Sequence, residues 1–137
     1  MSRLQRTVLI TGGATGIGLA SAHAFSEAGY NVVLTDLEQK AAQSAANEIN
    51  GPILALQLDV CDQTSITVAF SEGERVFGQI DVLHANAGVS SMKRALDLTE
   101  EDWDFNFNVN AKGIFLSNQV AIRHFLTHQN KGVIVNT

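Results

Sequence analysis

The sequence predicts an α/β protein in which a doubly wound, parallel β-sheet is covered by helices on both faces. Two observations lead to this fold class. Short apolar runs alternate with helical patterns along the chain of 137 residues, and such β-α-β alternation is typical of a parallel sheet. The runs are also nearly continuously apolar, as expected for strands that are covered on both sides. We therefore expect three layers, α/β/α.

Five apolar runs give the expected strands, and each is bounded by residues that favour a turn. The first run stops at the glycines that begin with Gly12, and the second stops at Asp36. The third follows a turn formed by Asn50, Gly51 and Pro52. The fourth and fifth runs are short and mainly apolar. The expected strands are 7–11, 31–36, 53–58, 82–85 and 132–136.

Five helical segments separate or follow these strands. Gly29 and Gly78 come directly after the first and third segments, where glycine ends a helix favourably. Thr99 is the expected N-cap of the fourth, because acidic residues fill the turn that follows it. The last segment is apolar around most of its circumference, so we expect more than one buried face. The expected helices are 17–28, 38–49, 63–77, one that begins after Thr99, and 109–126.

Composition excludes several kinds of partner. The chain has 14 Asp and Glu against 9 Lys and Arg, a net charge of −5 and no basic stripe, which argues against nucleic acid or an anionic membrane. Cys61 is the single cysteine, which fits a reducing compartment. No apolar run is long enough for a signal peptide or a spanning helix, so we expect a cytoplasmic protein without a membrane segment.

His124 and His128 lie four positions apart without an evident third ligand, so no metal site is expected.

The loop between the first strand and the first helix carries the clearest functional pattern. Glycines let a backbone turn tightly and approach a pyrophosphate, and a helix N-terminus offers free N–H groups to an anion. Because the pattern lies directly between a strand and a helix, we predict a Rossmann-type dinucleotide-binding loop. The alternative is a flexible glycine-rich turn. The loop reads Thr11-Gly12-Gly13-Ala14-Thr15-Gly16-Ile17-Gly18.

Asp36 ends the second expected strand, 18 positions past Gly18. A carboxylate about 20 residues beyond such glycines accepts hydrogen bonds from the adenosine ribose hydroxyls, and it would repel a 2′-phosphate. No Arg or Lys adjoins Asp36 or lies in the glycine loop. These features favour NAD over NADP as the cofactor. The alternative is that Asp36 caps the following helix.

Four motifs together resemble those of the short-chain dehydrogenase/reductase family. They occur in the family's order and spacing and extend over nearly the whole chain. The resemblance implies a sheet with strand order 3-2-1-4-5 and hydride transfer between a secondary alcohol, or the matching ketone, and a nicotinamide. The motifs are the glycine loop 11–18, Leu58-Asp59-Val60, Asn86-Ala87-Gly88 and Asn108-Val109-Asn110-Ala111-Lys112-Gly113.

The resemblance also implies roles for the matching residues. The glycine loop would hold the pyrophosphate, Asp36 the adenosine ribose, and Asp59 with Val60 the adenine. Residues 86–88 would run along the cofactor while Asn86 braces the sheet; the alternative is a plain turn. The implied cofactor-binding residues are Gly12, Thr15, Gly16, Ile17, Gly18, Asp36, Leu37, Asp59, Val60, Asn86, Ala87 and Gly88.

Asn110 matches the family's catalytic asparagine, which lies in mid-helix where a distortion holds a water in a proton relay. The alternative is a polar residue on a solvated helix face. One departure from the family pattern precedes Asn86: Ala85 stands where the family usually has asparagine, so one side-chain hydrogen bond is expected to be missing. With His84 before it, this motif resembles that of the family's polyol and sugar-alcohol members. The alternative is that His84 is a hydrogen-bonded polar residue at a strand end.

The family's tyrosine base has no counterpart among these residues. A phenol needs a neighbouring cation to lower its pKa toward neutrality, and the family supplies a lysine four positions on. Tyr30 is the only tyrosine, and Leu34 stands four positions later. We expect residues 1–137 to be a dinucleotide-binding domain that is incomplete at its C-terminus, with the catalytic Ser and Tyr-x-x-x-Lys beyond residue 137. The chain alone is then inactive. The alternative is a short, non-catalytic dinucleotide-binding module.

The outer face of the last expected helix bears on assembly. One apolar face of 109–126 would cover the sheet, and the other suits a subunit interface. The family resemblance implies pairing through this helix, so a homodimer or homotetramer is expected. A small alcohol or ketone is the expected substrate.

Overall fold

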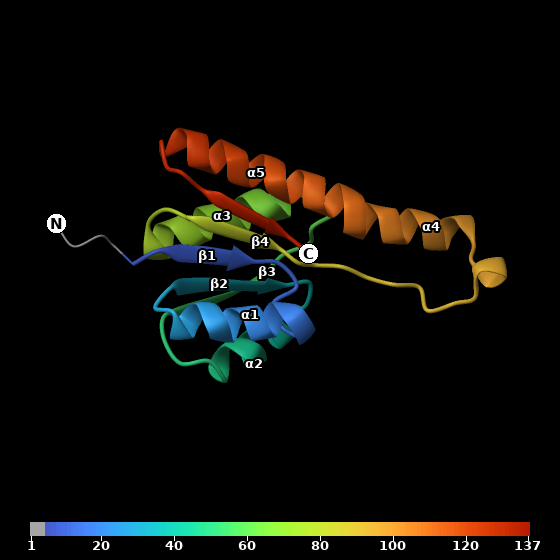
Figure 1. Cartoon of the computed structure of the whole chain (residues 1–137), viewed down its shortest axis with the longest axis horizontal. Coiled ribbons are helices and arrows are strands. Elements are labelled where there is room, and N and C mark those ends of the chain that lie inside the picture. Colours follow the sequence, from blue (N-terminus) through green and yellow to red (C-terminus); the bar gives the residue numbers. More distant parts are fainter. Residues whose placement is uncertain (1–4) are drawn as a thin grey trace.

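A computed structural model describes residues 5–137, and it has the predicted three-layer α/β architecture (Figure 1). Five parallel strands form one sheet in the order β3-β2-β1-β4-β5, which confirms the predicted order. In the central strands Val8 lies opposite Val32 on one side and Val82 on the other. The strands are β1 (Thr7–Ile10), β2 (Asn31–Asp36), β3 (Ile53–Gln57), β4 (Val82–Ala85) and β5 (Val133–Asn136).

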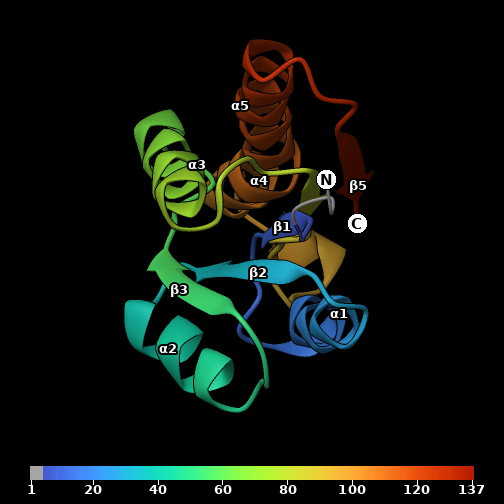
Figure 2. The same cartoon turned by 90° about the vertical axis from the view of Figure 1, so that its left-hand side faces the viewer.

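Helices cover the sheet from two sides. Figure 2 shows α3 and α5 on one face and α1 with α2 on the other. The expected helix at 38–49 is shorter, because the chain leaves the helix before Glu48. Among residues 5–137, no helix combines the length and apolarity needed to cross a membrane. The helices are α1 (Gly16–Glu27), α2 (Gln39–Asn47), α3 (Gln63–Phe77), α4 (Glu100–Phe107) and α5 (Gly113–Thr127).

Two apolar cores follow from the alternation of side chains along the strands. Successive residues of a strand point to opposite faces of the sheet. Leu9 and Val33 therefore pack toward α3 and α5, whereas Val8, Val32 and Leu34 pack toward α1 and α2. These side chains are fully buried, which explains why the runs read as continuously apolar.

The edge strand β5 differs from this pattern. Ile134 packs against the core beneath α5, but Val133 is 51% exposed and Val135 is 44% exposed. Within the described residues, β5 is therefore covered on one face only. The physical reason is alternation: in the described chain α5 covers the face of Ile134, while the two valines point to the face where α1 packs on β1 and β2 instead.

One long helical rod joins the last two predicted helices. A π-helical turn, η2 (Asn108–Lys112), connects α4 to α5. A loop and a short 3₁₀ helix, η1 (Ala95–Asp97), lead from β4 into α4. Residues 88–107 thus run outward from the sheet and back, and we call them the projecting arm (Figure 1). Its position places α4 beside the carboxyl ends of the strands.

Candidate functional site

A cleft of about 470 Å³ lies beyond the carboxyl ends of β1, β2, β3 and β4. In open α/β sheets this edge is where ligands bind. The cleft is lined by all of the predicted cofactor-binding residues except Gly18, and Leu58, Val89, Phe105 and Val109 complete its walls. Phe105 could not be predicted as a site residue because it lies on α4, where no sequence pattern relates it to the glycine loop. The structure brings the predicted residues together, and their individual contacts with a cofactor stay predictions.

The glycine loop is shaped by close backbone approaches. Gly12 and Gly16 have positive φ angles of 63° and 56°, which favour glycine. A Cβ at Gly12 would lie 2.8 Å from the Cα of Ala87. Gly18 lies beneath the loop instead of lining the cleft, and a Cβ there would lie 2.1 Å from the carbonyl oxygen of Gly12. Only glycine at these positions lets α1 begin close against the β1 and β4 loops.

Thr11 and Asn86 fasten the loops after β1 and β4 to each other. The Thr11 hydroxyl accepts hydrogen bonds from the backbone N–H groups of Asn86 and Ala87, both at 3.0 Å. The Asn86 side chain donates to the carbonyl oxygens of Thr11 at 3.2 Å and Gly12 at 3.0 Å. Asn86 therefore holds the two central loops together, a more specific task than forming a plain turn. The motif alone does not reveal this role of Thr11, because its partners lie 75 and 76 positions further along the chain.

The amino end of α1 is arranged to meet an anion. Thr15 occupies the N-cap with extended backbone angles, yet within residues 5–137 no side chain makes a capping hydrogen bond to the first turn. The first N–H groups of a helix lack intrahelical partners and carry the positive end of the helix dipole. No acidic residue lies in the first turn. These N–H groups and the glycine backbone fit a bound pyrophosphate.

Asp36 turns toward the glycine loop. Its Oδ2 accepts a hydrogen bond from the backbone N–H of Ala14 at 3.1 Å. The N-cap of α2 is Glu38, so the alternative that Asp36 caps the following helix is wrong. Among the described residues that line the cleft, none is Lys or Arg. The charged residues among the described lining of the cleft are therefore Asp36, beside the glycine loop, and Asp59.

Asp59 organises its own turn at the rim of the cleft. Its Oδ1 accepts from the N–H of Cys61 at 2.9 Å, and its N–H donates to the Ser65 hydroxyl at 3.0 Å. Burial raises the pKa of the Cys61 thiol, and Asp59 adds to this effect. Cys61 is therefore held in its protonated form, which is a poor nucleophile.

Asn110 lies in the middle of the π-helical turn, so the helix distortion expected at this residue is present. Its side chain accepts from the N–H of Val89 and donates to the carbonyl oxygen of Val89, both at 2.8 Å. Asn110 also lines a second cavity of about 450 Å³ that shares residues 87–89 with the cleft and reaches Thr137. Two bonds to the β4 loop contradict the alternative of a merely solvated side chain, and a catalytic role stays a prediction.

His84 is buried in β4 and contacts Thr137, a residue that lines this second cavity. Its Nε2 lies 2.7 Å from the Thr137 hydroxyl, whereas its Nδ1 has no hydrogen-bond partner among residues 5–137. Burial lowers the pKa of His84, so the ring is neutral near pH 7. The alternative, a hydrogen-bonded polar residue at a strand end, therefore holds for Nε2 but not for Nδ1.

A separate cluster joins α3 to the end of α5. Glu74 supplies the third group that the sequence did not reveal beside His124 and His128, and the ligand atoms of the three side chains lie within 4.8 Å of one another. Glu74 lies 50 residues before His124, so spacing could not connect them.

Hydrogen bonds assign the protons of this cluster. His124 Nε2 accepts from the Ile80 N–H at 2.9 Å, which leaves the ring proton on Nδ1, facing Glu74 at 3.8 Å. His128 Nδ1 donates to the His124 carbonyl at 2.9 Å, and its Nε2 lies 2.8 Å from Glu74. These two acceptors raise the pKa of His128, while burial lowers the pKa of His124. A metal-bound histidine normally donates from its second nitrogen, which His124 does not do. The arrangement favours the protonated form of His128 beside the Glu74 carboxylate, and the absence of a metal stays a prediction.

Known proteins resemble this chain over nearly its whole length. The family model described as short chain dehydrogenase matches residues 6–137. The chain belongs to the short-chain dehydrogenase family. This result agrees with the four motifs, with the strand order and with the cleft at the carboxyl ends of the strands.

Among curated members of the short-chain dehydrogenase family, the NAD-dependent glycerol dehydrogenase of Listeria innocua is 38% identical over 132 residues, which are 96% of this chain and 52% of that protein. The sorbitol dehydrogenase of Cereibacter sphaeroides is 35% identical over 131 residues, 96% of this chain and 51% of that protein. The chain thus spans about half the length of the curated relatives it matches.

A solved structure gives the same fold. The 3-ketoacyl-(acyl-carrier-protein) reductase of Brucella melitensis, crystallised with NADH, matches with a TM-score of 0.88 and 29% identity. The match covers 98% of this chain and 57% of that one. Short-chain dehydrogenases with different named substrates therefore share this half of the fold.

Proposed function

We propose that the protein is an NAD-dependent oxidoreductase that transfers a hydride between a secondary alcohol, of the polyol or sugar-alcohol class, and the nicotinamide. The observation that carries the cofactor assignment is Asp36. Its carboxylate ends β2 against the glycine loop, in a cleft whose described lining has no Lys or Arg to pair with a 2′-phosphate. The names of two relatives, a glycerol and a sorbitol dehydrogenase, support the substrate class.

The residues of the cleft fit a dinucleotide. A side chain at Gly12 would collide with the backbone of Ala87, so glycine keeps the loops after β1 and β4 close together, and the first N–H groups of α1 have no side-chain cap. The glycine loop would hold the pyrophosphate, Asp36 the adenosine ribose, and residues 59–60 the adenine. When bound, the nicotinamide supplies the acceptor or donor of the hydride.

The proton transfer requires groups outside the described residues. Tyr30 directly precedes β2, so it lies at the amino ends of the strands, opposite the cleft, and it packs edge-on against Phe25 with ring centroids 5.1 Å apart. We place the family's Ser and Tyr-x-x-x-Lys beyond residue 137. Asn110 would act beside them, at the cavity that adjoins the cleft. The 137-residue chain alone is then expected to bind NADH without turnover.

We further propose that the protein is cytoplasmic and assembles as a homodimer or homotetramer through the outer face of 109–126. Phe115 is 57% exposed, Ile122 48% and Leu126 73% on the rod formed by η2 and α5. An exposed apolar face of this kind marks a contact surface. The net charge of −5 supports a partner other than nucleic acid or an anionic membrane.

Titration of the full-length protein with NADH and NADPH tests the cofactor assignment. We expect NADH to bind at least about tenfold more tightly, because the carboxylate repels a 2′-phosphate. The variant Asp36→Ala should lose most of this preference, whereas Glu48→Ala, an exposed residue with the same change in charge, should keep it. A wild-type preference for NADPH would show that Asp36 has another role.

Turnover assays separate the enzyme from a non-catalytic dinucleotide-binding module. The full-length protein with NAD and a panel of polyols is expected to reduce NAD. Binding of NADH without turnover of any polyol or ketone would favour the module. Robust turnover by the 137 residues alone would contradict the assignment of the proton transfer to residues outside them.

A further inference from the structure

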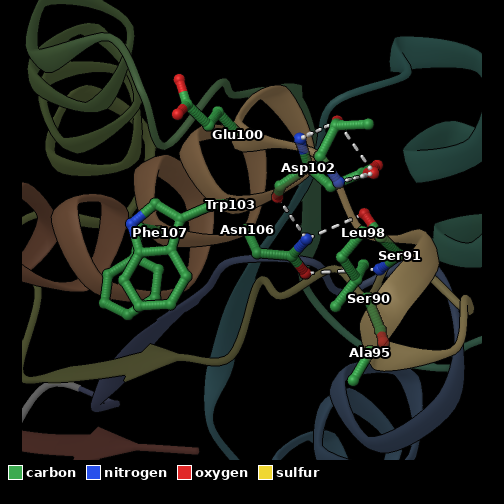
Figure 3. Close-up of a pocket in the computed structure, with 10 residues that line it drawn as sticks. Ser90, Ser91, Ala95, Leu98, Glu100, Asp102, Trp103, Asn106 and Phe107 are labelled. Atoms are coloured by element: carbon green, nitrogen blue, oxygen red, sulfur yellow. Dashed lines mark hydrogen bonds between the residues drawn. The ribbon is translucent and has the colours of Figure 1, made fainter.

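The loop that begins the projecting arm, residues 88–94, is held to the helical rod by three side chains that lie at successive turns of α4 and η2. Asn110 bonds to both backbone groups of Val89. Four residues earlier, the Asn106 side chain accepts from the Ser91 N–H at 3.3 Å and donates to the Ser91 hydroxyl at 2.8 Å (Figure 3). Asp102 accepts two hydrogen bonds from the Lys93 ammonium, at 2.7 and 2.9 Å.

The spacing of these contacts is regular. Helix residues 110, 106 and 102 meet loop residues 89, 91 and 93, so the two segments run in opposite directions. Four residues of a helix rise about 6 Å, and two residues of an extended chain advance about 6.6 Å. The near match lets one helix face bind alternate residues of the loop. We call these three contacts the polar zipper.

The outer contact of the zipper, between Lys93 and Asp102, is connected to further hydrogen bonds at the start of α4. The Lys93 ammonium, followed by hydrogen bonds from Thr99, holds the pKa of the Asp102 carboxyl well below its usual range. Asp102 also completes a capping box with Thr99 at the start of α4. The Asn106 side chain donates a further hydrogen bond to the Asp102 carbonyl oxygen at 2.6 Å, so the middle and outer contacts brace each other.

The loop residues that the zipper holds form walls of the candidate site. Val89 lines both the dinucleotide cleft and the adjoining cavity. Ser90, between the first two contacts, lines that cavity and a groove of about 570 Å³ against α4. The loop backbone therefore separates the space for the cofactor from the space beside it. A shift of Ser91 would move this wall.

We propose that Asn106 is a positioning residue, which through Ser91 sets the wall at residues 89–90 and so the fit of the alcohol substrate. This inference rests on the proposed function, because it assumes that the cavity beside the cleft receives the substrate. Asn106 lines the groove against α4 together with Ser90 and Ser91, but neither the cleft nor that cavity, so its effect on the cavity passes through the loop. Lys93 and Asp102 act in the same way from the outer end.

Two pairs of variants in the full-length protein test the proposal. Asn106→Ala removes the middle contact, and its control is Asn47→Ala, a helical asparagine whose side chain bonds only within α2. Lys93→Met removes the outer contact, and its control is Arg94→Met, which breaks the neighbouring ion pair to Asp97 at 2.9 Å without freeing the zipper. Lys93→Met keeps the test open if Asn106→Ala fails to fold.

The first readout is independent of activity. Trypsin cleaves after Lys93 and Arg94, which lie in the zippered loop. We expect Asn106→Ala to be cut there about fivefold faster than the wild type, as the loss of one net hydrogen bond predicts, and Asn47→Ala at the wild-type rate. Equal rates in Asn106→Ala and the wild type would overturn the zipper.

The second readout is the split between kcat and KM. In Asn106→Ala and Lys93→Met we expect KM for the polyol to rise about fivefold, with kcat changed less than about twofold and the Kd for NADH unchanged. Faster proteolysis with an unchanged KM would overturn the positioning role. If the wild type turns over no alcohol, the proposed function fails, while the proteolysis still decides the zipper.

Discussion

Different interactions stabilise the sheet and the projecting arm. In the sheet, Val8, Leu9 and Ile10 are fully buried between two layers of helices. In the arm, Leu96 is fully exposed and Met92 is 91% exposed, and the order of the loop comes from side-chain hydrogen bonds to one helix. Burial fixes the frame that the family's members share, while polar contacts fix the segment beside the ligand space. The second kind can change without loss of the first.

The largest expected contrast uses the same substitution in both regions. Leu9→Ala removes a fully buried side chain from the sheet and should lower the free energy of unfolding by about 3 kcal/mol. Leu96→Ala, at a fully exposed position in η1, should change it by less than about 0.5 kcal/mol. Chemical denaturation measures both values. A cost above about 1 kcal/mol for Leu96→Ala would show that the arm contributes a buried contact of its own.

The glycine loop should also be sensitive to added volume. In Gly18→Ala, the new methyl group would overlap the carbonyl oxygen of Gly12 and approach the Asn86 side chain, so backbone must shift. We expect a loss of about 2 kcal/mol in stability together with weaker NADH binding. Ala20→Ser, on the exposed side of the same helix, is the matched control. Unchanged NADH affinity in Gly18→Ala would separate the position of this loop from cofactor binding.

The smallest expected effect concerns the histidine cluster, the polar contact that ties α3 to α5. Because the pKa of His128 is raised in the folded protein, its stabilisation is present below the ordinary histidine pKa and disappears as the pH rises through the folded value. His124 has the opposite sign: its lowered pKa stabilises the fold above the ordinary value and is lost as the pH falls.

Glu74→Gln isolates the His128 contribution. NMR titration should find the pKa of His128 lowered toward its ordinary value, and the stability difference from the wild type should vanish at high pH. Glu72→Gln, which removes the partner of Arg75 on the same helix, should leave His128 unchanged. An unchanged pKa of His128 in Glu74→Gln would leave the His124 carbonyl as the sole cause of the shift.

Most of the frame could be predicted from the sequence because its causes are local. Apolar runs gave strands, glycines at 12, 16 and 18 indicated the tight loop, and Asp36 followed at the expected distance. The physical content of each signal lies within a few residues along the chain. The cleft then brought together residues from four strand ends because parallel strands end at one edge.

The contacts that could not be predicted join distant residues through side chains. Nothing in the sequence relates Glu74 to His124, or Ser91 to Asn106, since exposed polar residues carry no periodic pattern of their own. The two predicted helices at 100 and 109 proved to be one rod, because the chain passes from α4 to α5 through a π-helical turn without any break.

The hydrogen bonds by which Thr11 and Asn86 join the loops after β1 and β4 have a consequence for ligand affinity. Because one hydroxyl accepts two backbone amides and one carboxamide donates to two carbonyls, the loops that flank the cleft are ordered when the sheet folds. A ligand that enters a preordered cleft loses less of its binding free energy to immobilising the protein. We therefore expect dinucleotide affinity to depend on the integrity of the adjoining sheet. Substitutions that loosen β1 or β4 should weaken cofactor binding before they unfold the chain.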